Sequence, residues 1–277
     1  MNTNTDHKGQ RLQGIVLDVD GTLLDPEHRI APATAAAVRR ARSAGLHVLL
    51  ASGRSARAMV DVVAELELDD GPTVAFNGAL TFRLEDGAIH ALAETPLARD
   101  AAVEALALAR ERGIEVGWFT RDGWRASALG PGIGEEAGLT CEPPLLEPGL
   151  PDGAPAPFKL MCIAADGDGS PALHALRERL PPGVSGQFSH PRYLELIAAG
   201  VDKASALDAA CAALGLSLAQ FAALGDQEND IAMLRAAGIG IAMGNAEPAV
   251  IAAADRVTDT NARDGAARAI DALLDGP

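Results

Sequence analysis

Short apolar segments alternate with helical segments at both ends of this chain, and no other feature constrains its fold as strongly. Near the N-terminus the pattern comprises three strand-like and two helical segments, at residues 12–19, 46–51, 73–77, 32–44 and 55–67. The same alternation returns at residue 203 and continues to residue 274. Strands that alternate with helices form parallel sheets through right-handed crossovers. The sequence therefore predicts an α/β protein with a doubly wound, mainly parallel, Rossmann-like core.

Between these two halves the pattern is different. Residues 80–197 contain short strands in hairpin-like pairs and two helical segments, which is typical of an α+β unit with an antiparallel sheet. A Pro- and Gly-rich stretch at 142–157 favours a loop inside this unit over a linker, because strand and helix patterns continue after it. We therefore expect a core made of residues 12–79 and 198–277, an inserted α+β domain at 80–197, and a frayed tail at 1–11.

Charge and composition limit the partners of this chain. Its 277 residues carry a formal net charge of −15, which disfavours nucleic acids and anionic membranes as partners. It has neither an apolar run of transmembrane length nor an apolar leader-like segment near its start. Cys141, Cys162 and Cys211 are widely spaced, which predicts buried, reduced thiols. These features favour a cytoplasmic protein, and they leave open whether it is a monomer or a homodimer.

Two carboxylates follow the first apolar segment, in the order Asp18-Val19-Asp20-Gly21. Open α/β sheets bind ligands at the carboxyl ends of their strands, where these residues fall. Residues two apart in a strand point the same way, so one carboxylate can act as a nucleophile while the other moves a proton. A turn with a helix cap is the structural alternative. A calcium loop is a second alternative, but its spaced oxygen ligands and closing glutamate are absent.

A small hydroxyl and a lysine form two further candidates. Ser52-Gly53-Arg54 follows the second apolar segment and precedes a helix, so its hydroxyl and free amides suit a phosphate. The alternative is an ordinary helix cap formed by Ser52 or Ser55. Lys203 begins a helix, where the helix dipole disfavours a cation, and this indicates another use such as neutralising phosphate. The alternative is a solvated surface lysine.

The last candidate is the acidic segment GDQEND at residues 225–230, which follows another apolar run. Carboxylates without a neighbouring histidine or cysteine are hard oxygen ligands, and these suit Mg²⁺ better than zinc. The alternative is an acidic helix N-terminus, which the helix dipole favours in any case.

Taken in order, the four candidates resemble the four motifs of the haloacid dehalogenase-like (HAD) superfamily. The matching segments are DVDGTLL, SGR, LELIAAGVDK and GDQENDIAML, with Asn77-Gly78, AMGNA and NARDGAARAI as further matches. The insertion lies between the second and third motifs, as in the Cof-type subfamily (subclass IIB), and the resemblance covers residues 12–275. One departure is Ala204, where the family usually has glycine after the lysine. The resemblance implies that the inserted domain is a C2-type cap.

The resemblance also implies a role for each motif residue. Asp18 would attack phosphorus and form an aspartyl-phosphate, and Asp20 would protonate the leaving oxygen and then activate water. The ligands of Mg²⁺ would be Asp18, the backbone carbonyl of Asp20, Asp226 and Asp230. The phosphoryl oxygens would be held by Ser52, Gly53, Lys203 and Asn229. In this interpretation Asp18 and Asp20 form a like-charge pair, which eases protonation of one of them.

The implied activity is Mg²⁺-dependent hydrolysis of a small phosphomonoester, such as a sugar phosphate, by a phosphoric monoester hydrolase. Candidate substrate contacts are Arg54 and Asn77 in the core, and His190 and Arg192 in the insertion, for which surface packing is the alternative. Two other functions stay open at this point. One is a phosphomutase or other phosphotransferase similar to phosphomannomutases. The other is a non-catalytic sensor of a phosphorylated metabolite, which the presence of both motif aspartates disfavours.

Overall fold

The computed structural model describes residues 11–276, except for residues 70, 141 and 165–170. The chain divides into two compact units. The first combines the chain up to Leu92 with the chain from Asp202 onward, and the second runs from Ala93 to Val201. The first unit is therefore assembled from two separate stretches of sequence. Most of the tail expected at 1–11 lies outside the described residues.

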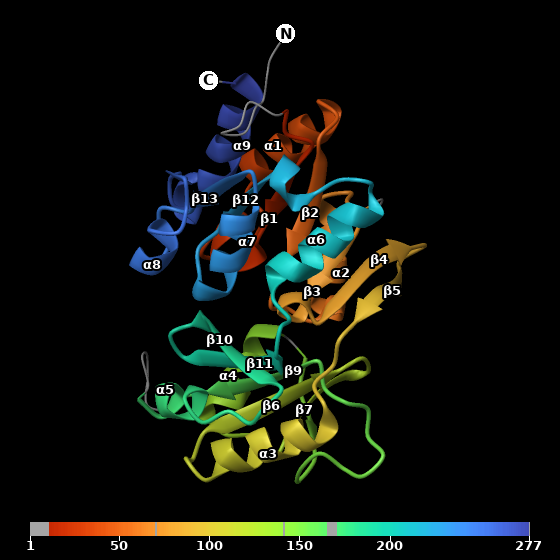
Figure 1. Ribbon diagram of the computed structural model, residues 1–277, viewed down its shortest axis with the longest axis vertical. Helices are drawn as coiled ribbons and strands as arrows, with labels where there is room; N and C mark the ends of the chain where they lie inside the picture. The colour runs from red at the N-terminus through yellow and green to blue at the C-terminus, as the bar shows by residue number, and fades with distance from the viewer. Residues whose placement is uncertain (1–10, 70, 141, 165–170, 277) are drawn as a thin grey trace. The chain divides into compact units, whose positions relative to one another are not determined.

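Among the described residues, the first unit contains an eight-stranded sheet (Figure 1). From edge to edge its strands are β14 (Arg256–Val257), β13 (Ile239–Ala242), β12 (Phe221–Gly225), β1 (Gly14–Leu17), β2 (His47–Ala51), β3 (Thr73–Ala75), β4 (Leu80–Glu85) and β5 (Ala88–Glu94). Every pairing from β14 to β3 is parallel, and β4 is antiparallel to β3. All residues of the central strand β1 are buried, because helices cover both faces of the sheet.

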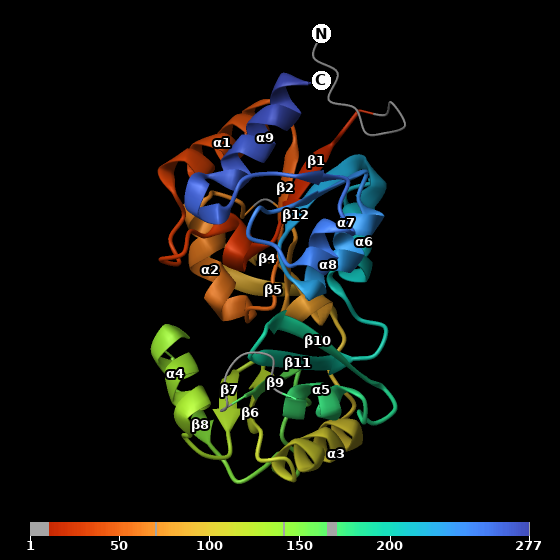
Figure 2. The ribbon, with the colours of Figure 1, turned by 90° about the vertical axis from the view of Figure 1, so that its left-hand side faces the viewer.

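The helices of the first unit pack on both faces of this sheet. They are α1 (Pro32–Ser43), α2 (Ala56–Glu65), α6 (Lys203–Ala213), α7 (Ile231–Ala236), α8 (Pro248–Ile251) and α9 (Gly265–Asp275). In Figure 2, α1 and α9 lie on one side of β1, β2 and β12, whereas α6 and α7 lie on the other. Leu207 of α6 and Met233 of α7 share one buried cluster with Val16 of β1 and Ala223 of β12. This arrangement confirms the predicted α/β class.

The hairpin formed by β4 and β5 corrects one expectation. The sequence pattern places residues 80–94 in the inserted domain, whereas the structure pairs Leu80 with Ala75 and Phe82 with Thr73 on the core sheet. A hairpin pattern predicts that two strands pair, but it does not reveal which sheet they join. The predicted boundary at residue 80 therefore differs from the structural division after Leu92.

The second unit contains a six-stranded sheet, again counted over the described residues. Its strands follow the order β10 (Val184–His190), β11 (Tyr193–Ala198), β9 (Lys159–Ile163), β6 (Glu115–Thr120), β7 (Gly123–Ala126) and β8 (Leu145–Leu146). All pairings are antiparallel except that of β7 with β8. The helices are α3 (Arg99–Arg110), α4 (Pro131–Thr140) and α5 (Pro171–Arg177). No helix in the described part of the chain is long and apolar enough to cross a membrane.

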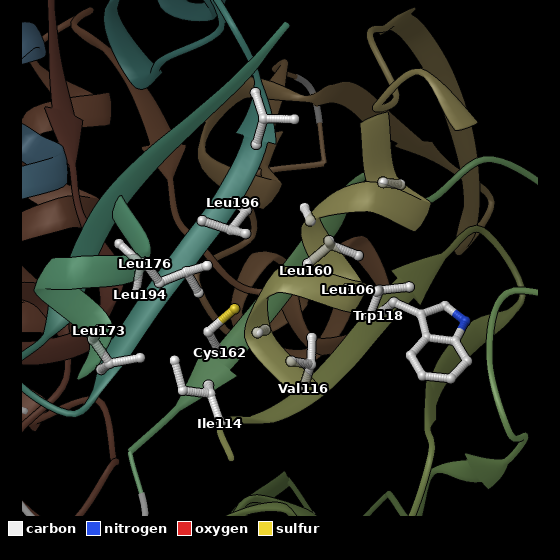
Figure 3. Packing of buried hydrophobic residues seen from close by; sticks show 14 of the residues in the cluster. Leu106, Ile114, Val116, Trp118, Leu160, Cys162, Leu173, Leu176, Leu194 and Leu196 are labelled. Atoms are coloured by element: carbon white, nitrogen blue, oxygen red, sulfur yellow. The ribbon is translucent and has the colours of Figure 1, made fainter. Parts of the chain in front are cut away.

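One face of this sheet forms the core of the second unit (Figure 3). Leu160 and Cys162 point to the same face of β9, because side chains alternate along a strand. They pack in one buried cluster with Leu194 of β11, Leu106 of α3 and Leu173 of α5. Helices α3 and α5 therefore cover the face of the sheet that carries Leu160 and Cys162.

The two described cysteines are buried free thiols, as the sequence predicts. Burial raises the pKa of the Cys162 thiol above its usual range. Burial, together with the Asp208 carboxylate, raises the pKa of Cys211 to about 12. Both thiols are therefore protonated and poorly reactive at neutral pH. Cys141 lies outside the described residues.

Helix α4 has no counterpart among the predicted elements. Its sequence is rich in glycine, which disfavours a helix. The carboxylate of Glu115 on β6 accepts hydrogen bonds from the backbone N–H groups of Gly132 at 3.1 Å and Ile133 at 2.9 Å. It thereby satisfies donors that the first turn of a helix leaves without partners. The start of α4 is stabilised by a residue distant in sequence, which no local pattern reveals.

Candidate active site

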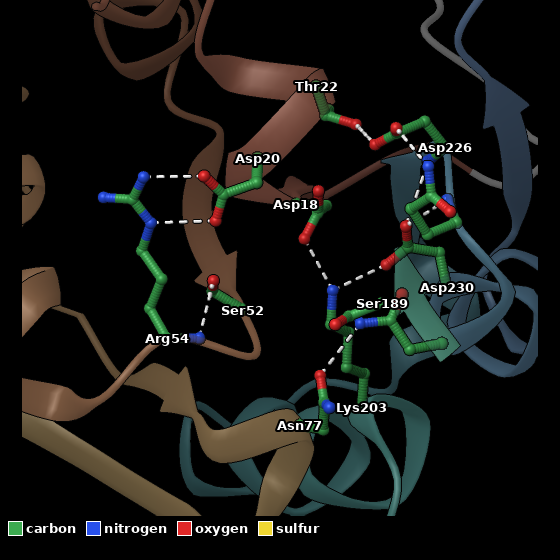
Figure 4. Close-up of polar contacts among 12 residues, drawn as sticks. Asp18, Asp20, Thr22, Ser52, Arg54, Asn77, Ser189, Lys203, Asp226 and Asp230 are labelled. Carbon is green, nitrogen blue, oxygen red and sulfur yellow. Dashed lines mark hydrogen bonds and ion pairs between the residues drawn. The ribbon is translucent and has the colours of Figure 1, made fainter. Parts of the chain in front are cut away.

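Polar residues from four neighbouring strands meet at one edge of the core sheet (Figure 4). Asp18 follows β1, Ser52 follows β2, Asn77 follows β3, and Asp226 follows β12. These strands are parallel neighbours, so their carboxyl ends lie at the same edge. Lys203 reaches the same place from the first turn of α6.

Lys203 is the central cation of this site. Its side chain is fully buried, and Nζ donates hydrogen bonds to Oδ1 of Asp18 and Oδ1 of Asp230, each at 2.6 Å. Asp202 caps α6 and forms a capping box with Ser205, which determines where the helix begins. Burial lowers the pKa of Lys203, but the two carboxylates outweigh this effect and hold the pKa above its ordinary value. The interpretation of a solvated surface lysine is therefore wrong.

Three buried carboxylates surround this ammonium group. Oxygen atoms of Asp18, Asp226 and Asp230 all lie within 4.8 Å of one another. Burial and the charge of Asp230 raise the pKa of Asp18 well above its ordinary value, although Lys203 opposes them. Burial and Asp230 likewise raise the pKa of Asp226 to about 7. When all three are ionised, one ammonium group leaves the cluster with excess negative charge.

Asp226 is held in place by residues that lie in the motif segments but were assigned no role by the sequence. Thr22 Oγ1 donates to Oδ1 of Asp226 at 2.9 Å. The amide nitrogen of Asn245 donates to Oδ2 of Asp226 at 3.3 Å and to the carbonyl of Gly21 at 2.9 Å. A Cβ atom on Gly21 would overlap the Asp226 carboxylate, and its φ of +78° also favours glycine. Because Asn245 comes shortly after β13, the rule about strand ends also predicts its place.

Asp230 serves two purposes at once. Its Oδ2 accepts hydrogen bonds from the backbone N–H groups of Asp226 at 2.9 Å and Gln227 at 3.0 Å. Its Oδ1 accepts from Lys203. Asp230 therefore accepts backbone hydrogen bonds at the start of this helical segment, as the structural alternative proposes, and also contacts Lys203 in the site.

Asp20 points to a different partner from Asp18 (Figure 4). Arg54 Nε donates to Oδ2 of Asp20 at 2.8 Å, and Nη2 donates to Oδ1 at 2.6 Å. His28 Nδ1 lies 3.7 Å from Oδ1 of Asp20. Partial desolvation opposes ionisation of Asp20, but the nearby His28 imidazole and the Arg54 guanidinium hold the pKa of Asp20 below the ordinary range. This differs from the expected like-charge pair, because the chain turns directly after β1 and the strand periodicity no longer applies.

Ser52 belongs to a tight turn and does not cap the helix. Its hydroxyl oxygen accepts a hydrogen bond from the N–H of Arg54 at 3.1 Å. The cap of α2 is Ser55, whose side chain accepts from the N–H of Ala58. Of the two capping alternatives, Ser55 is correct, and the buried Ser52 keeps its own O–H as a donor. Gly53 lies between these residues in the same turn.

Asn77 and Asn229 contact each other across the site. The amide nitrogen of Asn229 donates to Oδ1 of Asn77 at 2.9 Å. Both side chains are buried, and Oδ1 of Asn229 has no hydrogen-bond partner among the described residues. A buried amide oxygen without a partner costs free energy, and such atoms are common where a ligand or an ordered water supplies the missing hydrogen bond.

The two candidate substrate contacts in the second unit have partners within that unit. His190 Nδ1 accepts a hydrogen bond from the N–H of Arg192 at 3.2 Å. The guanidinium group of Arg192 donates to both carboxylate oxygens of Glu135, at 3.3 Å and 3.0 Å. These contacts give both residues a packing role, as the alternative interpretation proposes, and leave their relation to a substrate a prediction.

Comparison with known proteins identifies the family. A model of the haloacid dehalogenase-like hydrolases matches residues 15–270, which is most of the chain and includes every motif segment above. The chain belongs to the haloacid dehalogenase-like hydrolase family. This membership confirms the resemblance inferred from the motifs, and it confirms that the protein is a hydrolase.

Relatives of this HAD hydrolase are named as phosphatases. A 5-amino-6-(5-phospho-D-ribitylamino)uracil phosphatase from Bacillus subtilis is 29% identical and covers 92% of this chain and 93% of its own length. A pyridoxal phosphate phosphatase from Escherichia coli is also 29% identical and covers 92% of this chain and 96% of its own. A HAD-like hydrolase structure from Bacteroides thetaiotaomicron superposes with a TM-score of 0.80 at 29% identity, covering 94% and 98%.

Proposed function

We propose that this HAD hydrolase is a Mg²⁺-dependent phosphatase of small phosphomonoesters that works through an aspartyl-phosphate. The observation that carries the proposal is the buried contact of Lys203 with Asp18 at the end of β1, at 2.6 Å. It supports a nucleophile whose negative charge a fixed cation balances. Sugar phosphates are the first substrate class to test. We further propose that the second unit is the C2-type cap, which selects the organic part of the substrate.

The side chains can divide the work of phosphoryl transfer between them. Asp18 would attack phosphorus, and Asp20 would give a proton to the leaving oxygen and afterwards take one from water. Lys203 and the O–H of Ser52 would hold phosphoryl oxygens, together with the amides of Gly53 and Asn229. Positioning and neutralisation of charge are the main requirements of this reaction, and the site supplies both.

The donor set fits Mg²⁺. Three carboxylates from described residues converge within 4.8 Å, and no histidine or sulfur belongs to the group. Such hard oxygen ligands suit Mg²⁺, and their combined charge exceeds that of Lys203. We propose that Asp18, Asp226, Asp230 and the backbone carbonyl of Asp20 hold the ion. When bound, it would supply positive charge against the phosphoryl oxygens.

The metal proposal predicts that Asp226→Asn stabilises the protein in EDTA but removes its stabilisation by Mg²⁺. In EDTA, Asp226→Asn is expected to raise the Tm by a few degrees, because it removes one of three buried like charges. In the wild type, millimolar Mg²⁺ is expected to raise the Tm, and Asp226→Asn is expected to abolish this increase. Differential scanning fluorimetry with Mg²⁺ and with EDTA measures both effects. An undiminished response of the variant to Mg²⁺ would exclude Asp226 as a ligand.

Phosphate release from a panel of phosphorylated metabolites tests the function. The panel contains hexose and pentose phosphates and, following the relatives' names, pyridoxal phosphate and a phosphorylated ribityl compound. We expect release that requires Mg²⁺, stops in EDTA and identifies the preferred class. Transfer of phosphate between hexose phosphate isomers that exceeds phosphate release would instead make the protein a phosphomutase. Binding of these compounds without release or transfer would indicate a sensor.

A further inference from the structure

The proposed function described above gives no role to the ion pair between Arg54 and Asp20. One guanidinium group engages both carboxylate oxygens, at 2.8 Å and 2.6 Å, across 34 residues of sequence. A bidentate pair of this kind fixes the orientation of a carboxylate as well as its charge. Lysine or a single hydrogen bond would not restrain rotation of the carboxylate in the same way.

Arg54 is itself held at both ends of its backbone. Its N–H donates to the hydroxyl of Ser52 at 3.1 Å, and its carbonyl accepts from the N–H of Phe76 at 2.9 Å. The N–H of Ser52 donates to the carbonyl of Val74 at 2.9 Å. These hydrogen bonds join the loop after β2 to the end of β3, so the backbone of Arg54 is fixed in position.

The exposure of the pair argues against a purely structural purpose. The side chains of Arg54 and Asp20 keep 28% and 46% of their surface exposed. Ion pairs with this much contact with water contribute little to folding stability. Because Asp20 belongs to the site, its two-point contact with Arg54 therefore indicates a role in the reaction rather than in folding.

We propose that Arg54 is a positioning residue that orients the Asp20 carboxylate as the base of phosphoenzyme hydrolysis. The inference rests on the proposed function. In this step Asp20 takes one proton from water, the water oxygen bonds to phosphorus, and the bond between phosphorus and the Asp18 oxygen breaks. The products are inorganic phosphate, the Asp18 carboxylate and a protonated Asp20, whose proton then serves the next leaving oxygen. In this proposal Arg54 positions Asp20 and is not a substrate contact.

Arg54→Ala in the full-length chain with Mg²⁺ tests the proposal, using the best substrate of the panel with a ³²P label. We expect kcat to fall about 10- to 100-fold, because a base acts only within hydrogen-bond reach of its proton. KM should fall together with kcat, so that kcat/KM stays within about threefold, and phosphoprotein trapped by acid quenching should accumulate because its hydrolysis slows. Arg40→Ala is the matched control. It removes a bidentate pair with Asp271 outside the site, and it should change neither value.

Two further variants separate positioning from folding. Arg54→Lys keeps the charge but loses the two-point contact, so its kcat should lie between those of wild type and Arg54→Ala. Adding Arg54→Ala to Asp20→Asn should cost less than about threefold more, because Arg54 acts through the carboxylate already removed. The inference would be overturned if the two substitutions reduced kcat independently, so that the double variant lost the product of both factors. It would also be overturned if Arg54→Ala kept the wild-type kcat and accumulated no phosphoprotein. A wild type that releases no phosphate would overturn the proposed function itself.

Discussion

Asp18→Asn is expected to abolish phosphate release, by at least ~10⁴-fold, while the chain still folds. The amide cannot attack phosphorus, so no aspartyl-phosphate forms at this position. The change keeps the size of the side chain, and Lys203 still contacts Asp230 at 2.6 Å. Removal of one buried like charge also relieves repulsion from Asp230, which helps to raise the pKa of Asp18. Initial rates on the best substrate, and the Tm in EDTA, measure the two halves of this prediction.

Asp271→Asn supplies the matched control, because it makes the same chemical change at an exposed carboxylate outside the site. This control should keep wild-type kcat. Acid-quenched Asp18→Asn should carry no ³²P, whereas the wild type should be labelled. Activity of Asp18→Asn within about tenfold of wild type would show that another group attacks phosphorus.

The positions of the site residues along the strands could be predicted from the sequence. Apolar runs mark the parallel strands, and their carboxyl ends must share an edge, so Asp18, Ser52, Asn77 and Asp226 come together. The same rule also covers Asn245, to which the AMGNA match assigned no role. This part of the prediction depends on strand direction, which the local alternation of strands and helices indicates well.

Side-chain directions at the strand ends could not be predicted in this way. Strand periodicity places Asp18 and Asp20 on one side, but β1 ends at Leu17 and a helical turn begins at Val19, between the two carboxylates, which face different cations. The partners that decide these directions, Lys203 and Arg54, lie 185 and 34 residues away in the sequence. Contacts over such distances leave no periodic signal. The dependence of α4 on Glu115 escaped prediction for the same reason.

Lys203→Met is expected to lower the free energy of unfolding by roughly 3–5 kcal/mol and to reduce kcat by at least about 10³-fold. Methionine keeps an unbranched apolar stem at a position where the Lys203 side chain has no exposed surface, so the main change is loss of the ammonium group. Without it, Asp18, Asp226 and Asp230 are buried with no cation between them. Urea unfolding in EDTA measures the stability, and phosphate release with Mg²⁺ measures the activity.

The pH dependence of this loss distinguishes charge from packing. Burial and Asp230 raise the pKa of Asp226 to about 7. Between the ordinary pKa of an aspartate and about pH 7, Asp226 therefore binds a proton more tightly in the folded protein than in the unfolded chain. The contribution of Asp226 to stability in EDTA therefore falls as pH rises through this window, and it falls more steeply without the ammonium group. The deficit of Lys203→Met should be smaller at about pH 5 than at about pH 8. Adding Asp230→Asn should recover part of the stability but none of the activity. An equal deficit at both pH values would indicate lost packing, and would remove Lys203 from its role as the balancing charge.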